Sequence, residues 1–345
     1  MTKQSLENSA QRLEGELLNN IIPFWLENGL DKDKGGLFAG LDRRGKLIET
    51  DKSIWFQGRS AWLFSKLFEK SGNSEYLRAA ESIIGFLRNY GFDTDGRMFF
   101  RVDQDGRPLI KRRYLFSETF AVIALAAFGK ATDQNKYISE AEDLLDKIIY
   151  WSETPGFLEP KWNPASRNQI GLAFPMIMTA TIQELRLASP KKTDKWNELI
   201  EGYIQSIQSN FMNGEVKGVL EISSSKGVLL DHFEGRVLNP GHSLEASWFI
   251  LREGLFRKKE EYIETAITIF DWMWEWGWDK EYGGIYYFRD ALNYPSSEYW
   301  HDMKFWWPQC EAVISSLLIW KTSSDDTYLE KFHMALDWAE SKLKD

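Results

Sequence analysis

Apolar side chains recur along this chain at the spacing of amphipathic helices. Residues that step by four, three and four positions share one helix face, as do Leu244, Trp248, Leu251 and Leu255. The set Trp307, Glu311, Ile314 and Leu318 has the same spacing. Applied to the whole chain, this pattern predicts eleven helices, roughly over residues 5–27, 54–71, 73–91, 115–131, 134–152, 168–188, 192–211, 240–257, 259–278, 303–323 and 325–344.

Short stretches rich in Gly and Asp separate successive pairs of these helices. They begin at Asp31, Phe92, Thr154, Asn213 and Asp279, about 60 residues apart, and each is typical of a β-hairpin or a loop. A period that holds two helices and a turn indicates a repeat of helical hairpins. We therefore predict an all-α fold with short β-hairpins at one end, and a kink in the first helix at Pro23.

The number of helices bears on how such a fold closes. A ring of six hairpins needs twelve helices, and the pattern predicts eleven. We therefore expect one domain over residues 1–345, an incomplete α/α barrel that lacks its last helix. Because an open barrel would expose an apolar seam, we expect self-association, with a homodimer as one form.

Composition narrows the classes of partner. The net charge of −9 and the pI near 5.2 argue against nucleic acid and against an anionic membrane surface. No apolar run approaches the roughly 20 residues of a membrane-spanning helix. The single cysteine, Cys310, rules out a disulfide within the chain and favours a reducing compartment. With no signal-peptide pattern, we expect a cytoplasmic protein.

The 16 Trp residues allow two interpretations, a core with large side chains or a pocket lined with aromatic faces. Arg59 stands between Trp55 and Trp62 on one helix face, and a buried arginine needs an oxygen-rich partner. That partner would be either a ligand or a core carboxylate. Trp307 and Glu311 are one turn apart and could face the same cavity, although aromatic residues at this spacing also build cores.

His242 is the strongest candidate for acid–base chemistry. Asn239 can cap a helix whose first residue is Pro240, which puts His242 in the first turn. The helix dipole there would favour neutral imidazole, the form that can accept a proton. Glu245 shares the face of His242 and could orient the ring or bind a hydroxyl group. The alternative is a polar residue that merely starts a helix.

The sequence contains no motif for a phosphate-binding, metal-binding or redox site. We find no Gly-rich phosphate loop, no HExxH and no CxxC in the sequence. No pair of histidines has metal-ligand spacing. We therefore expect neither a metal nor a cofactor.

Four phrases carry a resemblance to a known family. FQGRSAW, FSETFAV, NPGHSLEASW and KFWWPQCEAVISSLL occur in this order. The chain thereby resembles the N-acylglucosamine 2-epimerase family, which includes cellobiose 2-epimerases and mannose isomerases, from its first helix to its end. The resemblance implies an (α/α)6 barrel and an isomerase.

The resemblance also implies roles for individual residues. His242 matches a catalytic histidine, Glu245 its supporting carboxylate, and Arg59 the arginine that holds the substrate oxygens. The remaining matches are the carboxylate Glu311, the aromatic walls Trp248 and Trp307, and the substrate-binding positions Lys304, Glu118 and Met176.

The implied reaction removes the proton at C2 of an opened sugar and returns it to the other face through an enediolate. Phe116, the stretch from Phe174 to Met176, and Pro308 resemble the branch that interconverts N-acylglucosamine and N-acylmannosamine. The alternatives are an aldose–ketose isomerase or a 2-epimerase of another sugar, such as mannose or cellobiose.

A departure from the family supports one more alternative. Family members continue with a segment that supplies a second catalytic histidine, which this sequence does not contain. The chain could therefore be an inactive barrel that binds a sugar or a protein partner.

Overall fold

The structure is a computed structural model that describes residues 3–224 and 226–344. It divides into two compact units. Unit 1 comprises the described residues up to Pro160 together with Glu184–Lys191, and unit 2 comprises Lys161–Gln183 and the described residues from Lys192 onward. Among the described residues, no helix combines the length and apolar character needed to cross a bilayer.

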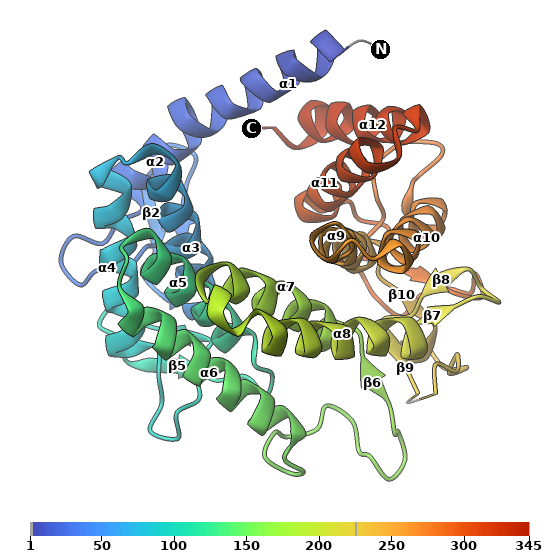
Figure 1. The fold of residues 1–345 in the computed structure, drawn as a ribbon, viewed down its shortest axis with the longest axis horizontal. Helices are drawn as coiled ribbons and strands as arrows, with labels where there is room; N and C mark the ends of the chain where they lie inside the picture. The colour runs from blue at the N-terminus through green and yellow to red at the C-terminus, as the bar shows by residue number, and fades with distance from the viewer. Residues whose placement is uncertain (1–2, 225, 345) are drawn as a thin grey trace. The chain divides into compact units, whose positions relative to one another are not determined.

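Unit 1 opens with one continuous helical segment (Figure 1). It runs through α1 (Lys3–Glu16), the π-helical turn η1 (Leu17–Ile21) and α2 (Ile22–Asn28). The change of winding falls immediately before Pro23, the residue at which the sequence predicts a kink. A π-helical turn is a recognised cause of helix bending, so the irregularity lies one turn earlier than expected.

Two helical hairpins complete unit 1, α3 (Ile54–Ser71) with α4 (Ser74–Tyr90) and α5 (Phe116–Ala131) with α6 (Asn135–Glu153). Helix α3 also packs on α5. The boundary between α3 and α4 follows from local chemistry. Gly72 ends α3 with a φ of 69°, and the side chain of Asn73 accepts a hydrogen bond from the N–H of Glu75 to start α4.

Unit 2 contains the same kind of hairpin, α9 (Pro240–Arg257) with α10 (Glu260–Gly277) and α11 (Trp306–Ser323) with α12 (Asp326–Leu343). Here α9 packs on α11. Helix α8 (Thr193–Asn210) belongs to unit 2, and α7 (Ala173–Ala188) contributes residues to both units. Two short 3-10 helices, η2 (Pro190–Lys192) and η3 (Glu234–Arg236), lie in connections.

Short antiparallel strands connect the helices. They are β1 (Gly40–Leu41) with β2 (Leu47–Glu49); β3 (Lys52–Ser53), β4 (Arg101–Val102) and β5 (Pro108–Ile110) in one sheet; β6 (Ile170–Gly171) with β9 (Ile222–Ser223); β7 (Met212–Asn213) with β8 (Gly218–Val219); and β10 (Val237–Leu238) with β11 (Arg289–Asp290). Four of the five predicted hairpin stretches contain strands, and the described stretch from Thr154 to Arg167 is a loop.

The helix prediction is confirmed with two shifted boundaries. With α1 to α2 taken as one segment, the described residues contain the eleven helical segments that periodicity predicts. Helix α7 starts at Ala173 rather than residue 168, because Ile170 and Gly171 pair with β9. Helix α11 starts at Trp306 rather than residue 303.

Helices of two kinds form the core. Helix α5 buries eleven of its 16 residues and α9 eleven of its 18, many of them Ala, Gly and Ser. Helix α6 buries five of its 19 residues, on one face. The core interpretation of the tryptophans is confirmed for Trp196 and Trp274, which are buried, whereas Trp306 is 62% exposed.

A glutamine clamp recurs at the start of α3 and of α11. The amide of Gln57 accepts from the N–H of Leu37 at 2.7 Å and donates to the carbonyl of the same residue at 2.7 Å. Gln309 binds Ile285 in the same way, at 2.8 and 3.0 Å. Both glutamines are fully buried. Each clamp therefore fixes the first turn of its helix to the Gly-rich turn that lies earlier in the chain, at Leu37 or Ile285.

An ion pair accompanies each clamp, fully buried at Lys52 and partly buried at Lys304. Lys52 Nζ lies 2.6 Å from Asp31 Oδ2, and Lys304 pairs with Asp279. Both aspartates also accept two backbone N–H groups of their own turn. Gly36 and Gly284 follow with φ of 78° and 82°, values that favour glycine. The repeat found in the sequence is thus a repeat of specific contacts.

Candidate functional site

Helix α9 places His242 in its first turn, as the sequence predicts. Asn239 is the N-cap, and its Oδ1 accepts from the backbone N–H of His242 at 3.1 Å. Pro240 is the first helical residue, where a missing N–H costs nothing. The predicted cap is confirmed.

The ring of His242 is held by a carboxylate that sequence analysis did not identify. His242 Nδ1 lies 3.1 Å from Oε1 and 3.0 Å from Oε2 of Glu221. Nδ1 also lies 3.1 Å from the amide Nδ2 of Asn239, which can only donate. A carboxylate only accepts hydrogen bonds, so the two oxygens of Glu221 favour a proton on Nδ1 over a hydrogen bond from Asn239. No hydrogen bond from the described residues reaches Nε2, and the side chain is 28% exposed. Nε2 is therefore the nitrogen open to a ligand.

The charge around His242 corrects the expectation of a neutral ring. Burial alone would lower the pKa of His242, but the charge and hydrogen bond of Glu221 and the charges of Glu245 and Glu311 outweigh it and raise the pKa to about 9. Three nearby carboxylates thus outweigh the helix dipole. A pKa raised in this way favours the imidazolium form at neutral pH.

Two aromatic residues form a wall beside this imidazolium. The Trp307 ring lies 5.3 Å from the His242 ring, centroid to centroid, at an angle of 36°. Tyr287 packs edge-on against Trp307, with centroids 5.9 Å apart. Burial, and then the charge of Glu221, raise the pKa of the Tyr287 hydroxyl. Tyr287 is a second residue of this region that sequence reasoning missed.

Helices α9 and α11 are joined at the site by a polar contact. Trp248 donates its indole N–H to Oε2 of Glu311 at 2.7 Å. The structure thus brings together the predicted residues His242, Trp248, Trp307 and Glu311. Glu245 adds its charge to the field at His242, but among the described contacts the ring-orienting residue is Glu221 rather than Glu245.

Periodicity could have revealed Glu221. Leu220 and Ile222 on either side of it are buried, and Glu221 is half-buried, as expected where side chains alternate between two faces of an extended segment. The alternation is only three residues long and lies within a predicted hairpin. It indicates a face but not which residue that face meets.

Two other predicted residues of unit 2 have structural partners. Lys304 pairs with Asp279 in the repeated turn, and its ammonium lies 5.0 Å from the ring centroid of Tyr286. Met176 in α7 is 1% exposed. Their predicted contact with substrate stays a prediction.

Arg59 and Glu118 lie in unit 1. Arg59 is exposed, and its guanidinium lies 4.7 Å from the Phe120 ring and 5.7 Å from the Trp55 ring. No carboxylate of the described residues pairs with it. Of the two partners that the sequence left open, the core carboxylate is therefore not observed among the described residues, and an aromatic surface supports the side chain.

Glu118 occupies the clamp position of α5. Its Oε1 accepts from the N–H of Met98 at 2.9 Å, as Gln57 Oε1 does from Leu37. The same oxygen pairs with Arg97 Nε at 2.6 Å, and the Glu118 side chain is fully buried. Glu118 therefore has a structural role, the binding of Met98 and Arg97. Its role in substrate binding stays a prediction.

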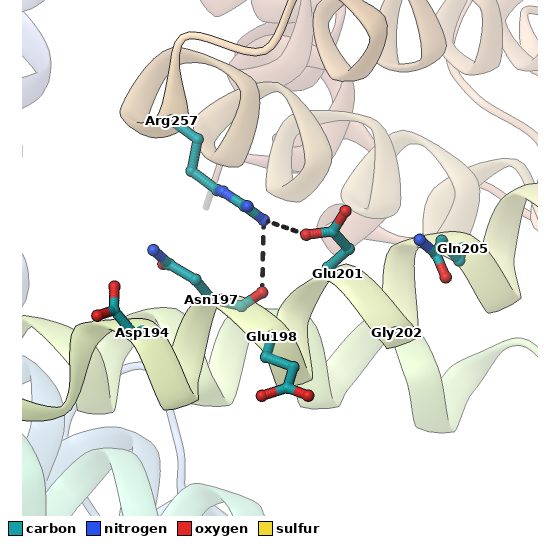
Figure 2. A pocket seen from close by; sticks show the side chains of 7 residues that line it. All are labelled: Asp194, Asn197, Glu198, Glu201, Gly202, Gln205 and Arg257. Carbon is teal, nitrogen blue, oxygen red and sulfur yellow. Dashed lines mark hydrogen bonds and ion pairs between the residues drawn. The ribbon is translucent and has the colours of Figure 1, made fainter.

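A separate hollow on unit 2 contains none of these residues. Figure 2 shows Arg257 reaching from α9 toward α8, with Nη1 at 3.0 Å from Glu201 Oε2 and 3.4 Å from the carbonyl of Asn197. The hollow has a volume of about 580 Å³, and its lining is Asp194, Asn197, Glu198, Glu201, Gly202, Gln205 and Arg257. Glu201 also pairs with Lys259, so its charge is compensated locally.

Comparisons with known proteins point to one family. A family model described as N-acylglucosamine 2-epimerase (GlcNAc 2-epimerase) matches residues 36–345. The chain is 30% identical over 357 residues to N-acylglucosamine 2-epimerase of Homo sapiens, covering 99% of this chain and 83% of that protein. The Rattus norvegicus protein of the same name is 32% identical over 354 residues, with 99% and 83% covered.

A solved structure shows the shared fold. The cellobiose 2-epimerase from Bacillus thermoamylovorans B4167 superposes with a TM-score of 0.83 at 18% identity, covering 98% of this chain and 89% of that one. The fold class is that of the (α/α)6 barrels, as the family resemblance implies, with eleven helical segments among the described residues.

Proposed function

Because the chain belongs to the N-acylglucosamine 2-epimerase family, we propose that it interconverts N-acylglucosamine and N-acylmannosamine. The family consists of carbohydrate epimerases and isomerases, and its curated members with this activity align over nearly the whole chain. The observation that carries the proposal is the His242 ring, held by Glu221 beside Trp307.

The reaction requires proton transfer at C2. A reducing sugar first opens its ring and exposes an aldehyde at C1. A base removes the C2 proton, and the electron pair of the broken C–H bond passes into an enolate of C1 and C2, which is an enediolate in a sugar whose C2 bears a hydroxyl group. Return of a proton to the opposite face of C2 gives the epimer. Each transfer requires an acid or a base close to C2.

His242 can serve this reaction as the acid. Its Nε2–H donates a proton to C2 of the enediolate, and the ring becomes neutral. In the reverse direction the neutral ring removes the same proton from C2. The carboxylate of Glu221 stays ionised throughout and stabilises the imidazolium.

The other predicted residues enter the proposal through the family resemblance. Arg59 would place positive charge near the enediolate oxygens, which stabilises charge that develops during the reaction. Trp248 and Trp307 would provide flat faces for the sugar. Lys304, Glu118 and Met176 would contact substrate directly or support residues that do.

Oligomeric state and location are part of the proposal. We propose a homodimer that acts on a free sugar in the cytoplasm, without nucleic acid as a partner. The acidic composition and the single cysteine support this assignment. Light scattering on the purified chain measures the oligomeric state directly.

The activity is tested by proton NMR in D2O with N-acetylglucosamine and N-acetylmannosamine. Deuterium at C2 together with the other epimer is the expected result, and His242→Asn should abolish it. The control is His301→Asn, in the loop before α11, which should retain activity. With mannose or cellobiose as substrate, a ketose product would assign an aldose–ketose isomerase, because the proton then returns to C1. No exchange with mannose, cellobiose or either amino sugar would contradict the enzyme assignment.

A further inference from the structure

The backbone around Glu221 is fixed on both sides. The N–H of Glu221 donates to the carbonyl of Val237 at 3.0 Å, and its own carbonyl accepts from the N–H of Leu172 at 3.0 Å. Leu220 and Ile222 are buried, so the segment is also held by packing. The carboxylate therefore projects from a rigid support toward the start of α9.

This support fixes the geometry of the His242 ring. Both oxygens of Glu221 lie within 3.1 Å of Nδ1, and Asn239 holds the backbone of the same histidine. The Trp307 ring borders the imidazole. A ring held at one nitrogen and packed against an indole has little freedom to rotate, so a single nitrogen, Nε2, remains for exchange with a ligand.

We propose that Glu221 is the positioning residue of the reaction, which directs Nε2 of His242 to the substrate and keeps the ring protonated until the enediolate forms. The inference rests on the proposed function and deepens it. The family resemblance gives the supporting role to Glu245, one turn along the same helix. In this chain the hydrogen bond to the ring comes from Glu221, which belongs to a different part of the sequence.

The charged groups around His242 come from four elements. Glu221 precedes β9, Glu245 lies on α9 and Glu311 lies on α11, and all three stabilise the imidazolium. Tyr287, on the segment before α11, contacts Trp307 and carries the remaining titratable group. Of the three carboxylates, Glu221 has the largest effect and provides the hydrogen bond to the ring.

In the proposed proton transfer, His242 and Glu221 each have a defined protonation state. The Nε2–H bond breaks and its electron pair stays on the nitrogen, while the electron pair of the enediolate forms the new C2–H bond. Nδ1 keeps its proton and continues to donate it to Glu221. The histidine thus passes between imidazolium and one defined neutral tautomer, and Glu221 never takes up a proton.

The test is NMR titration of the His242 imidazole in the wild-type chain and in Glu221→Gln. Loss of the charge should lower the titration midpoint by about 1 to 3 pH units, and should shift the neutral ring away from the tautomer with a proton on Nδ1. Glu215→Gln, an exposed residue of the same strand-rich segment, is the matched control and should leave both unchanged. An unchanged midpoint and tautomer in Glu221→Gln would overturn the inference.

A shorter carboxylate separates charge from position. In Glu221→Asp the charge remains but its oxygens no longer reach Nδ1. The inference therefore predicts a midpoint above that of Glu221→Gln, loss of the defined tautomer, and a kcat at least tenfold below that of the wild type. Wild-type kcat and tautomer in Glu221→Asp would contradict a positioning role. The titration needs no substrate, so it tests the contact between Glu221 and His242 even if the deuterium-exchange assay detects no activity. A failure of the inference can therefore be distinguished from a failure of the proposed function.

Discussion

The indole of Trp307 lies directly against Gly241, so that a Cβ atom at position 241 would stand 2.5 Å from the ring. Gly241→Ala should therefore displace Trp307 and destabilise the chain by about 1–3 kcal/mol, the usual cost of overpacking. Because Trp307 also borders His242, we expect kcat/KM to fall. Urea unfolding and steady-state kinetics measure the two effects.

The control for this substitution is Gly202→Ala in α8. No heavy atom lies within 4 Å of a Cβ built there. Alanine favours a helix, so stability should stay the same or rise by about 0.4–1 kcal/mol. If Gly241→Ala behaved like this control, the close packing of Trp307 on α9 would be wrong.

A second prediction separates two roles of Glu118. In Glu118→Gln the buried Arg97 loses its counter-charge, so we expect a loss of about 3 kcal/mol in the free energy of unfolding, with KM unchanged. A residue that binds substrate would give the opposite pattern, a raised KM at normal stability. Denaturant unfolding and substrate kinetics on the same variant distinguish these outcomes.

A third prediction compares the two paired lysines of the repeat. Lys52→Met leaves Asp31 buried without its partner and should destabilise the chain by about 3–5 kcal/mol. Lys304→Met should cost less, because the Lys304 side chain is 15% exposed whereas that of Lys52 is fully buried. Chemical denaturation measures both variants.

If Lys52→Met destabilises the chain by leaving Asp31 without a counter-charge, removal of the charge of Asp31 should restore part of the lost stability. Asn at position 31 keeps an oxygen for the N–H groups of Asp33 and Lys34 but carries no charge. The double variant Asp31→Asn/Lys52→Met should therefore be more stable than Lys52→Met alone. A double variant that is less stable than Lys52→Met would show that the charge of Asp31 is not a burden once Lys52 is replaced, which would contradict the ion-pair account.

A fourth prediction follows from the raised pKa of His242. The unfolded chain titrates near 6.5 and the folded protein near 9, so the folded state binds the extra proton between these values. The stability that protonation contributes is complete below about pH 6.5 and is lost as the pH rises toward 9. The Tm difference between wild type and His242→Asn should therefore shrink from pH 6 to pH 9.5. A constant difference would contradict the raised pKa.

The sequence predicts the helices well because apolar periodicity and capping residues are local signals. Asn239 with Pro240 locates the start of α9, and the repeated Gly and Asp stretches locate the turns. The start of α7 is misplaced because β6 pairs with a strand distant in sequence, which local periodicity does not contain.

The chemistry of the site is less predictable for the same reason. His242 and Glu311 are identified by spacing and family resemblance, but the charge state of His242 depends on Glu221, 21 residues earlier in the chain. The surroundings of Arg59 depend likewise on Phe120 of another helix. Both are properties of tertiary packing.

The clamps at Gln57 and Gln309 hold the chain just before a helix and again at its first turn. The chain between the two anchored residues is longer before α11 than before α3. Lys52, Lys304 and Trp307 tie parts of these segments to the rest of the fold, but other parts are exposed, as at Ile48 and Tyr299. Segments of this kind tolerate insertion and replacement, since closing a somewhat longer loop adds little entropic cost. Relatives could thus diverge in what they recognise by exchanging one anchored loop, while the helices keep the same register.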